Sequence, residues 1–232
     1  MKGVIHFHSD HSYDSNFSIE KIIEKSIEKE LDFLILTDHD TIDGSIELRS
    51  TLKKYGHDIV VPIAAEYRTE VGDLIAVFIH EEIVDMSLEG FVAAVRKQGG
   101  IILFPHPSCH HKMHFIDEIC KKVNIIEVFN SRCSLEQDIF ASNKSKEFDI
   151  PSYVGSDAHL SREFGSVVVE YDLIVDENSL KKSLLYGSYK VINSKKTTKK
   201  NICLSQLIKS LKNYRFLSIL KNILCLLKSK NI

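Results

Sequence analysis

Short apolar runs alternate with segments of helical periodicity along most of this chain, and this alternation limits its fold more than any other feature. The runs suit strands that are buried on both faces of a sheet. They predict strands over residues 4–8, 33–37, 59–65, 74–79, 101–104, 125–129, 152–155 and 167–171. The segments between them predict helices over residues 19–30, 45–55, 88–98, 135–148 and 179–186. This alternation is typical of an α/β barrel or of an open parallel sheet.

Side chains that can bind metal lie at the C-terminal ends of five of the predicted strands. They are His6 and His8, Asp38 and His39, Glu66, His106, and Asp157 and His159. In a barrel the C-terminal ends of all strands form one rim, and the active site lies at that rim. Unrelated polar groups near turns would rarely recur on so many strand ends. The pattern therefore favours a barrel whose functional site gathers these side chains.

The first of these pairs, His6 and His8, has the spacing i, i+2. Alternate side chains of a strand point to the same face, so both imidazoles can reach one point in space. A mixed set of imidazoles and carboxylates suits Zn, Mn or Fe, whereas a structural zinc site is usually closed and richer in cysteine. The sequence therefore predicts a site for divalent metal at the rim.

The order of these motifs resembles the polymerase and histidinol phosphatase (PHP) family of metal-dependent phosphoesterases. The motifs are H-x-H at residues 6–8, T-D-H-D at 37–40, the lone Glu66, P-H-P at 105–107 and G-S-D-A-H at 155–159. The resemblance implies a distorted seven-stranded (β/α) barrel, similar to a TIM barrel, with two or three divalent ions at its rim. The metal set that it implies is His6, His8, Asp14, His39, Glu66, His106, Asp157 and His159. Asp14 belongs to this set because residues 12–15 are similar to the family's short acidic loop after H-x-H.

The sequence departs from the family pattern at one ligand. Many members carry a histidine shortly after the lone glutamate, whereas this chain offers Asp73. Asp73 is therefore the corresponding candidate for a second ion, and Cys133 is another.

The resemblance and the donor set together predict hydrolysis of a phosphate mono- or diester on a small molecule, a nucleotide or a nucleic-acid end. Two ions bridged by a carboxylate such as Glu66 or Asp157 would convert a trapped water into hydroxide at neutral pH, and the hydroxide would attack phosphorus. Arg132, just past a predicted strand, is placed to hold a phosphate through two hydrogen bonds, although an ion pair at the rim explains it equally well. Arg132, Asp157 and His159 are the candidate catalytic residues.

Two other functions stay open. An amidohydrolase-type C–N hydrolase also uses metals at a barrel rim, but it usually has a metal-bridging lysine, and no lysine follows a predicted strand here. A non-catalytic metal-binding regulatory module is the second alternative, and the complete ligand set argues against it. Four further histidines lie in loops and either contact substrate or are solvated, namely His11, His110, His111 and His114.

The last forty residues differ in composition from the rest. Residues 193–232 contain ten Lys and Arg and no Asp or Glu, so their formal charge is about +10 against about −12 for residues 1–192. We therefore predict a hydrolase barrel over residues 1–192 and a basic tail of one or two amphipathic helices over residues 193–232. The tail is expected to govern location or assembly, by packing on the barrel or a second copy or by binding an anionic surface, and not chemistry.

Cysteine usage and hydropathy concern the compartment. The five cysteines show no C-x-x-C spacing, which favours reduced thiols in a cytoplasm over a disulfide scaffold. The first predicted strand begins at residue 4, which leaves no room for a signal peptide. No run approaches the ~18 apolar residues of a membrane span. We expect a cytoplasmic protein without a transmembrane segment.

Overall fold

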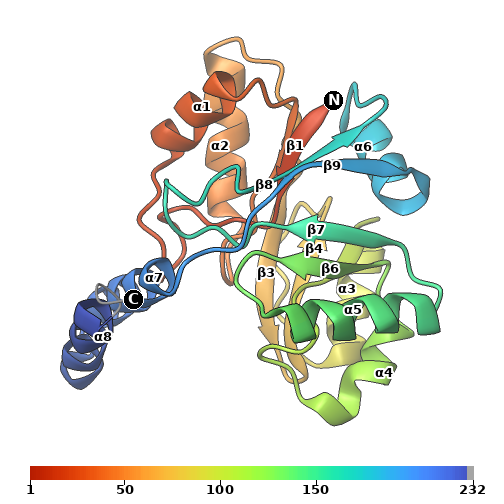
Figure 1. The fold of residues 1–232 in the computed structure, drawn as a ribbon. Coiled ribbons are helices and arrows are strands. Elements are labelled where there is room, and N and C mark those ends of the chain that lie inside the picture. Colours follow the sequence, from red (N-terminus) through yellow and green to blue (C-terminus); the bar gives the residue numbers. More distant parts are fainter. Residues whose placement is uncertain (229–232) are drawn as a thin grey trace.

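In the computed structural model, which describes residues 1–228, the strands form two sheets with helices packed against their outer faces (Figure 1). The strands are β1 (Lys2–Ile5), β2 (Phe33–Ile35), β3 (Ala64–Thr69), β4 (Gly72–Val77), β5 (Ile101–Phe104), β6 (Ile125–Asn130), β7 (Ser152–Gly155), β8 (Val167–Tyr171) and β9 (Tyr189–Ser194). The helices are α1 (Ile19–Glu28), α2 (Asp43–Lys54), α3 (Leu88–Lys97), the 3-10 turn η1 (Met113–Phe115), α4 (Ile116–Cys120), α5 (Leu135–Glu147), α6 (Glu177–Tyr186), α7 (Lys199–Lys212) and α8 (Phe216–Lys228).

The α/β class is confirmed, whereas residues 1–228 do not form the expected closed barrel. One sheet has the order β2-β1-β8-β9 and the other the order β3-β4-β5-β6-β7. Only isolated bridges join the two, among them Phe7 with Ala158 and His39 with Glu66. The sheets separate because β1 and β2 are only four and three residues long, and the chain leaves extended geometry at His6, where φ is 60°.

Several predicted strands have the expected bounds, and the differences bear on the site. β5, β7 and β8 coincide with their predictions. β3 begins five residues later than predicted, so that Glu66 lies inside the strand and not at its end. β4 runs antiparallel to both β3 and β5, and β3 and β4 form a hairpin that Gly72 helps to close with a φ of 132°. Only Gly adopts such a φ without strain. β9 was missed because it is a half-exposed edge strand with no apolar run.

An apolar cluster between the two sheets takes residues from both of them. Alternate residues of β5 divide between this cluster and the outer one: Ile101 and Leu103 face inward, while Ile102 and Phe104 face α3 and α4. Both faces of β5 are therefore buried, which explains why its sequence is continuously apolar.

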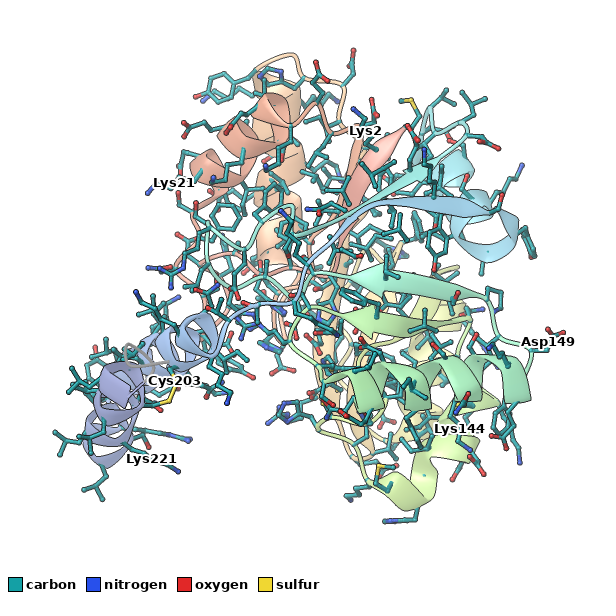
Figure 2. All side chains as sticks on the ribbon, viewed as in Figure 1. Lys2, Lys21, Lys144, Asp149, Cys203 and Lys221 are labelled. Atoms are coloured by element: carbon teal, nitrogen blue, oxygen red, sulfur yellow. A yellow bond between two sulfur atoms is a disulfide. The ribbon has the colours of Figure 1, made fainter. Side chains whose placement is uncertain are left out.

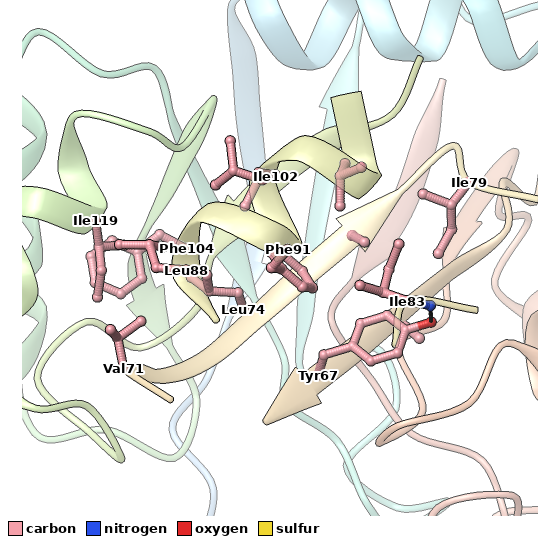
Figure 3. Close-up of a cluster of buried hydrophobic side chains, with 14 of the residues drawn as sticks. Tyr67, Val71, Leu74, Ile79, Ile83, Leu88, Phe91, Ile102, Phe104 and Ile119 are labelled. Atoms are coloured by element: carbon pink, nitrogen blue, oxygen red, sulfur yellow. Dashed lines mark hydrogen bonds between the residues drawn. The ribbon is translucent and has the colours of Figure 1, made fainter. Parts of the chain in front are cut away.

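Figure 3 shows part of the outer cluster on the β3–β7 sheet, where Phe91 of α3 packs beside Tyr67 of β3 with 5.7 Å between ring centroids. The Tyr67 hydroxyl accepts a hydrogen bond from the Ile83 backbone N–H at 3.3 Å. A corresponding cluster joins α1 and α2 to the other sheet. The two sheets are thus packed against apolar clusters on both faces.

The last two helices, α7 and α8, form an antiparallel hairpin that stands out from the sheets (Figure 1). A disulfide joins Cys203 to Cys225, with 6.1 Å between their Cα atoms (Figure 2). The prediction that all five cysteines are reduced is therefore wrong for this pair. The two cysteines are 22 residues apart in the sequence and meet only because α7 and α8 pack against each other, which no short cysteine motif indicates. Cys109, Cys120 and Cys133 are free thiols, as expected.

The chain crosses the predicted boundary at residues 192/193 without a break. β9 pairs with β8 through Ser194, and beyond it the Thr197 N–H donates to the Ser131 carbonyl at 2.8 Å. The division into residues 1–192 and 193–232 stays a prediction, and residues 229–232 lie outside the described part. Between residues 1 and 228 no helix has both the length and the apolar character that crossing a bilayer requires.

Candidate metal centre

The segments after β1 and after β7 lie side by side and bring together predicted ligands from both ends of the domain. The His8 N–H donates to the Ala158 carbonyl at 2.9 Å, and the Asp157 N–H donates to the His6 carbonyl at 2.6 Å. His6 and Asp157 have φ values of 60° and 47°, and His106 has 28°. Residues other than Gly adopt such conformations at a cost, and they cluster at functional sites. Both histidines of H-x-H therefore lie just past the end of β1, in a strained segment and not on the strand itself.

Glu66 lies at the centre of the candidate site. Its backbone is fixed by the segment after β2, since the Glu66 N–H donates to the Asp38 carbonyl at 3.0 Å. Its Oε2 lies 3.3 Å from His6 Nε2, 3.4 Å from His8 Nε2 and 3.6 Å from His39 Nδ1. Its Oε1 lies 3.1 Å from the fourth imidazole, that of His106, at Nε2. One buried carboxylate among four imidazoles is an arrangement suited to bridging two cations.

Asp14 and His159 extend this centre on the side of the loop after β1. His159 Nε2 lies 3.3 Å from Asp14 Oδ1, and His39 Nε2 lies 3.5 Å from Asp14 Oδ2. Within the described residues, three groups have donor atoms within 4.8 Å of one another: His8, His39 and His159; His6, His8 and Asp157; and His6, Glu66 and His106. The structure thus brings together every member of the ligand set that the family resemblance implied.

The donor atoms fit a divalent cation. His8 Nδ1 lies 3.2 Å from Ser12 Oγ, and that hydroxyl donates to Asp38 at 3.0 Å, so it accepts from the His8 Nδ1–H. The lone pair of His8 Nε2 is therefore left facing the centre, where this atom is buried without a hydrogen-bond partner, as is Asp14 Oδ1. A buried polar atom without a partner costs about 1–3 kcal/mol, which a bound cation would offset.

Glu127 of β6 was not predicted, yet it contacts two of the predicted ligands, His6 and His106. Its Oε1 accepts from His6 Nδ1 at 2.9 Å, and its Oε2 accepts from the His106 N–H and from Asn130 Nδ2, both at 2.8 Å. Gly155 makes room for this carboxylate, because a Cβ at that position would lie 1.8 Å from Glu127 Oε1. The sequence signal was an acidic residue inside an apolar strand. Since Glu127 holds the Nδ1–H of His6, it leaves Nε2 of that ring as the atom that can bind metal.

Electrostatics separate the imidazoles into two kinds in the metal-free protein. Burial lowers the pKa of His106, but the hydrogen bond and charge of Glu66 outweigh it and raise that pKa to about 10. The pKa of His39 rises to about 9 in the same way, as Glu66 and Asp14 outweigh burial. Burial and two neighbouring imidazoles instead lower the pKa of His8 to about 3. Burial opposes ionisation of Glu66, yet the imidazoles around it hold its pKa well below the usual range.

The other predicted residues lie at the edge of the centre. Asp73 is outside the three donor groups, and its Oδ1 accepts from Arg68 Nε at 3.1 Å. Cys133 is also outside them, with its Sγ 3.5 Å from that of Cys109. Arg132 donates to Glu163 Oε2 and to Ser205 Oγ, both at 2.9 Å, while its Nε is buried without a partner.

The loop histidines differ in their positions. His110 borders the cavity described below. His11 pairs with Glu47 at 2.8 Å on the surface. His111 Nε2 lies 2.7 Å from the Asp73 carbonyl.

A cavity of about 190 Å³ opens beside the ligands. One side is formed by predicted metal ligands and Arg132, and the other by Ile202, Gln206 and Lys209 of α7. The segment 193–232, which the sequence predicts to govern location or assembly and not chemistry, thus contributes three residues to the lining of the cavity. Nothing in the sequence around Lys209 distinguishes it from the other lysines of the tail, so its position beside the cavity could not be predicted.

Comparison with known proteins identifies a family whose model matches most of the chain. The model of the PHP domain family matches residues 5–217. The uncharacterized protein MJ0417 of Methanocaldococcus jannaschii is 33% identical over 116 residues, which cover 46% of this chain and 49% of that protein. The matched segment thus spans about half the length of that curated relative.

Two solved structures are similar in fold at 15% identity each. A two-domain protein of Bacteroides vulgatus containing a predicted PHP-like metal-dependent phosphoesterase has a TM-score of 0.68, covering 84% of this chain and 65% of that one. An amidohydrolase from Chromobacterium violaceum, solved with bound sulfate and no metal, has a TM-score of 0.55, covering 68% of this chain and 87% of that one. At this identity both show the fold alone.

Proposed function

The chain belongs to the PHP domain family, and from this premise we propose that it is a metal-dependent phosphoesterase that hydrolyses a phosphate mono- or diester. The observation that carries the proposal is the position of Glu66, whose buried carboxylate faces four imidazoles beside a cavity. The cavity is also bordered by Arg132 and Lys209, two cations suited to an anionic substrate. A purely structural metal site would not need such an opening.

We propose that the ligand set holds two or three divalent ions, Mn, Zn or Fe. When bound, these ions would supply the Lewis acid that activates water and neutralises charge on the phosphate. Glu127 orients His6, and Asn130 Nδ2 lies 3.3 Å from Asp157 Oδ2, where it can hold that carboxylate in place. The Nε–H of Arg132, which has no hydrogen-bond partner in the protein, is left to donate to a phosphate oxygen. Asp157 and His159, on the same short segment, border the cavity beside it.

The test begins with the metal and then the reaction. Purified protein should carry two or three equivalents of Mn, Zn or Fe, and the loaded protein should hydrolyse 4-nitrophenyl phosphate, bis(4-nitrophenyl) phosphate or a short RNA. Asp157→Asn should lower kcat by orders of magnitude with the fold intact, while Asp172→Asn, the same change at an exposed position, should leave kcat unchanged. Only trace metal in a folded protein would end the catalytic interpretation. Hydrolysis of amides or lactams, and of no phosphoester, would favour a C–N hydrolase.

The cytoplasmic location and the partners of the tail stay predictions from the sequence. α8 exposes several apolar side chains, among them those of Leu217, Leu220 and Leu224. The charged residues of the surrounding segment are all basic. This pattern supports contact with an anionic surface or with a second copy of the chain.

A further inference from the structure

We propose that α7 is part of the active site, and that Lys209 binds the phosphoryl group of a compact phosphate monoester. This inference rests on the proposed phosphoesterase function and identifies a substrate-binding residue in the tail. Ile202, Gln206 and Lys209 all border the cavity and follow one another at i, i+4 and i+7. Residues at this spacing share one face of a helix. That face is therefore turned toward the predicted ligands.

Hydrogen bonds along its whole length hold α7 over the cavity. Arg162 Nε donates to Asn201 Oδ1 at 2.6 Å near the start of the helix, and Arg132 Nη1 donates to the buried Ser205 in its middle. At its end Lys212 Nζ donates to the Asp10 and Ser12 carbonyls, both at 2.8 Å. These partners lie in the loops after β1, β6 and β7. A helix fixed at three places on the loops that carry the ligands is a wall of the site and not a loosely attached tail.

The charges around the cavity single out Lys209. Arg68 is neutralised by Asp73 at 3.1 Å and Arg132 by Glu163 at 2.9 Å. Lys209 Nζ lies 3.7 Å from Asp14 Oδ2 and 4.3 Å from the ring centroid of Tyr13.

Asp14 belongs to the predicted metal set, so its charge would be shared with a cation. Among the described residues that border the cavity, Lys209 is then the cation without a dedicated carboxylate. Its side chain is only 30% exposed, which strengthens its interaction with an anion.

The size of the cavity restricts the substrate. The cavity has a volume of about 190 Å³. Pockets for larger ligands are commonly about 300–1,000 Å³. With α7 as a wall, the space suits a terminal phosphoryl group and a few further atoms. An internal phosphodiester would have to place a second ester arm in the same space.

The experiment compares Lys209→Met and Lys209→Arg with Lys221→Met in the full chain. Lys221→Met removes the same charge from the tail at an exposed position on α8. Each protein is loaded with Mn, and we measure its metal content, its Kd for inorganic phosphate by calorimetry, and kcat and KM on the mono- and diester above.

Lys209→Met should weaken phosphate binding and raise KM by about 10- to 100-fold, because a charge-assisted hydrogen bond is lost, while the metal content stays the same. Lys209→Arg should recover most of this loss, and Lys221→Met should behave as wild type. Wild type should prefer the monoester over the diester by at least about tenfold in kcat/KM.

Wild-type phosphate affinity and KM in Lys209→Met would overturn the inference and leave the phosphoesterase proposal standing. Loss of a metal equivalent in this variant would also overturn it, because Lys209 would then act through the metal centre. If no ester is cleaved by wild type, the proposed function fails, but the phosphate Kd still decides the role of Lys209. If Lys209→Met binds inorganic phosphate more weakly than wild type and Lys221→Met does not, Lys209 is part of a phosphate subsite. If wild type binds no phosphate, or binds it as tightly as Lys209→Met does, the inference is refuted.

Discussion

Replacing Glu127 with Gln tests whether this buried carboxylate sets the tautomer of His6. In the wild type, Glu127 only accepts hydrogen bonds: from His6 Nδ1 at 2.9 Å and from His106 N and Asn130 Nδ2 at 2.8 Å. Glutamine has one oxygen and one NH₂ group. If the oxygen faces His106 and Asn130, the NH₂ group faces His6 Nδ1, which must then become an acceptor. The ring proton would move to Nε2, the atom that lies 3.3 Å from Glu66 and is needed for metal.

The opposite orientation of the glutamine is no better. Its NH₂ group would then face two N–H donors, those of His106 and Asn130, and would leave both without an acceptor in a buried place. Each unsatisfied buried donor costs about 1–3 kcal/mol. We therefore expect Glu127→Gln to adopt the first orientation and to bind metal about 10- to 100-fold more weakly, the usual effect of losing such a partner. At about 1.36 kcal/mol per factor of ten, this is about 1.4–2.7 kcal/mol.

The assay is a competition between the protein and a chromophoric chelator for Mn or Zn at fixed pH, followed by kcat at saturating metal. Circular dichroism and denaturant unfolding check that the variant is folded. Glu118→Gln, the same change at an exposed position of α4, is the control and should bind metal as the wild type does. A folded Glu127→Gln protein with wild-type metal affinity would refute the argument, because His6 would then keep its Nδ1–H without Glu127.

Three further predictions concern protons, packing and the tail. The pKa values of His39 and His106 are about 9 and 10 in the metal-free protein, whereas an imidazole that binds metal is neutral. Metal binding at pH 7.5 should therefore release at least two protons, and the metal affinity should rise with pH up to about 10. Calorimetry in buffers of different ionisation enthalpy measures the proton release, and heats that do not depend on the buffer would contradict it. Gly155→Ala should lower the free energy of unfolding by about 1–3 kcal/mol and weaken metal binding, since the new Cβ would meet Glu127. A denaturant titration that finds unchanged stability would contradict the close contact between residue 155 and the Glu127 carboxylate. Leu220→Asp with Leu224→Asp should reduce binding to anionic vesicles at least about tenfold with kcat unchanged, whereas a fall in oligomeric mass instead would show that α8 meets a second copy.

Much of the fold could be predicted because its strands are buried on both faces. β5 and β7 have apolar sequences with distinct ends, and their bounds agree with the prediction. The closed barrel could not be predicted correctly, since pairing between strands depends on how long each strand stays extended. β1 ends before His6, and β3 turns back into β4, so hydrogen bonding divides into two sheets. Hydrophobic periodicity in the sequence indicates neither the early end of β1 nor the hairpin of β3 and β4.

The candidate site likewise has two kinds of residues. Some could be predicted from their spacing in the sequence, and others come together only through tertiary packing. His6 and His8, or Asp157 and His159, are near neighbours in the chain, so that one local turn presents both members of a pair. Glu127 acts differently, because it contacts His6 from a strand that is 121 residues away in the sequence.

Glu127 also accepts from the backbone N–H of His106, and both His6 and His106 have positive φ values. One carboxylate therefore helps to hold two strained residues, a role that follows from tertiary packing and from no motif. α7 is a second case, since its cavity-facing residues are ordinary for an amphipathic helix and gain their meaning only from Ser205 and Lys212, which fix it to the rim. The predicted ligands are thus identified by local motifs, while their orientation and the α7 side of the cavity depend on residues far away in the chain.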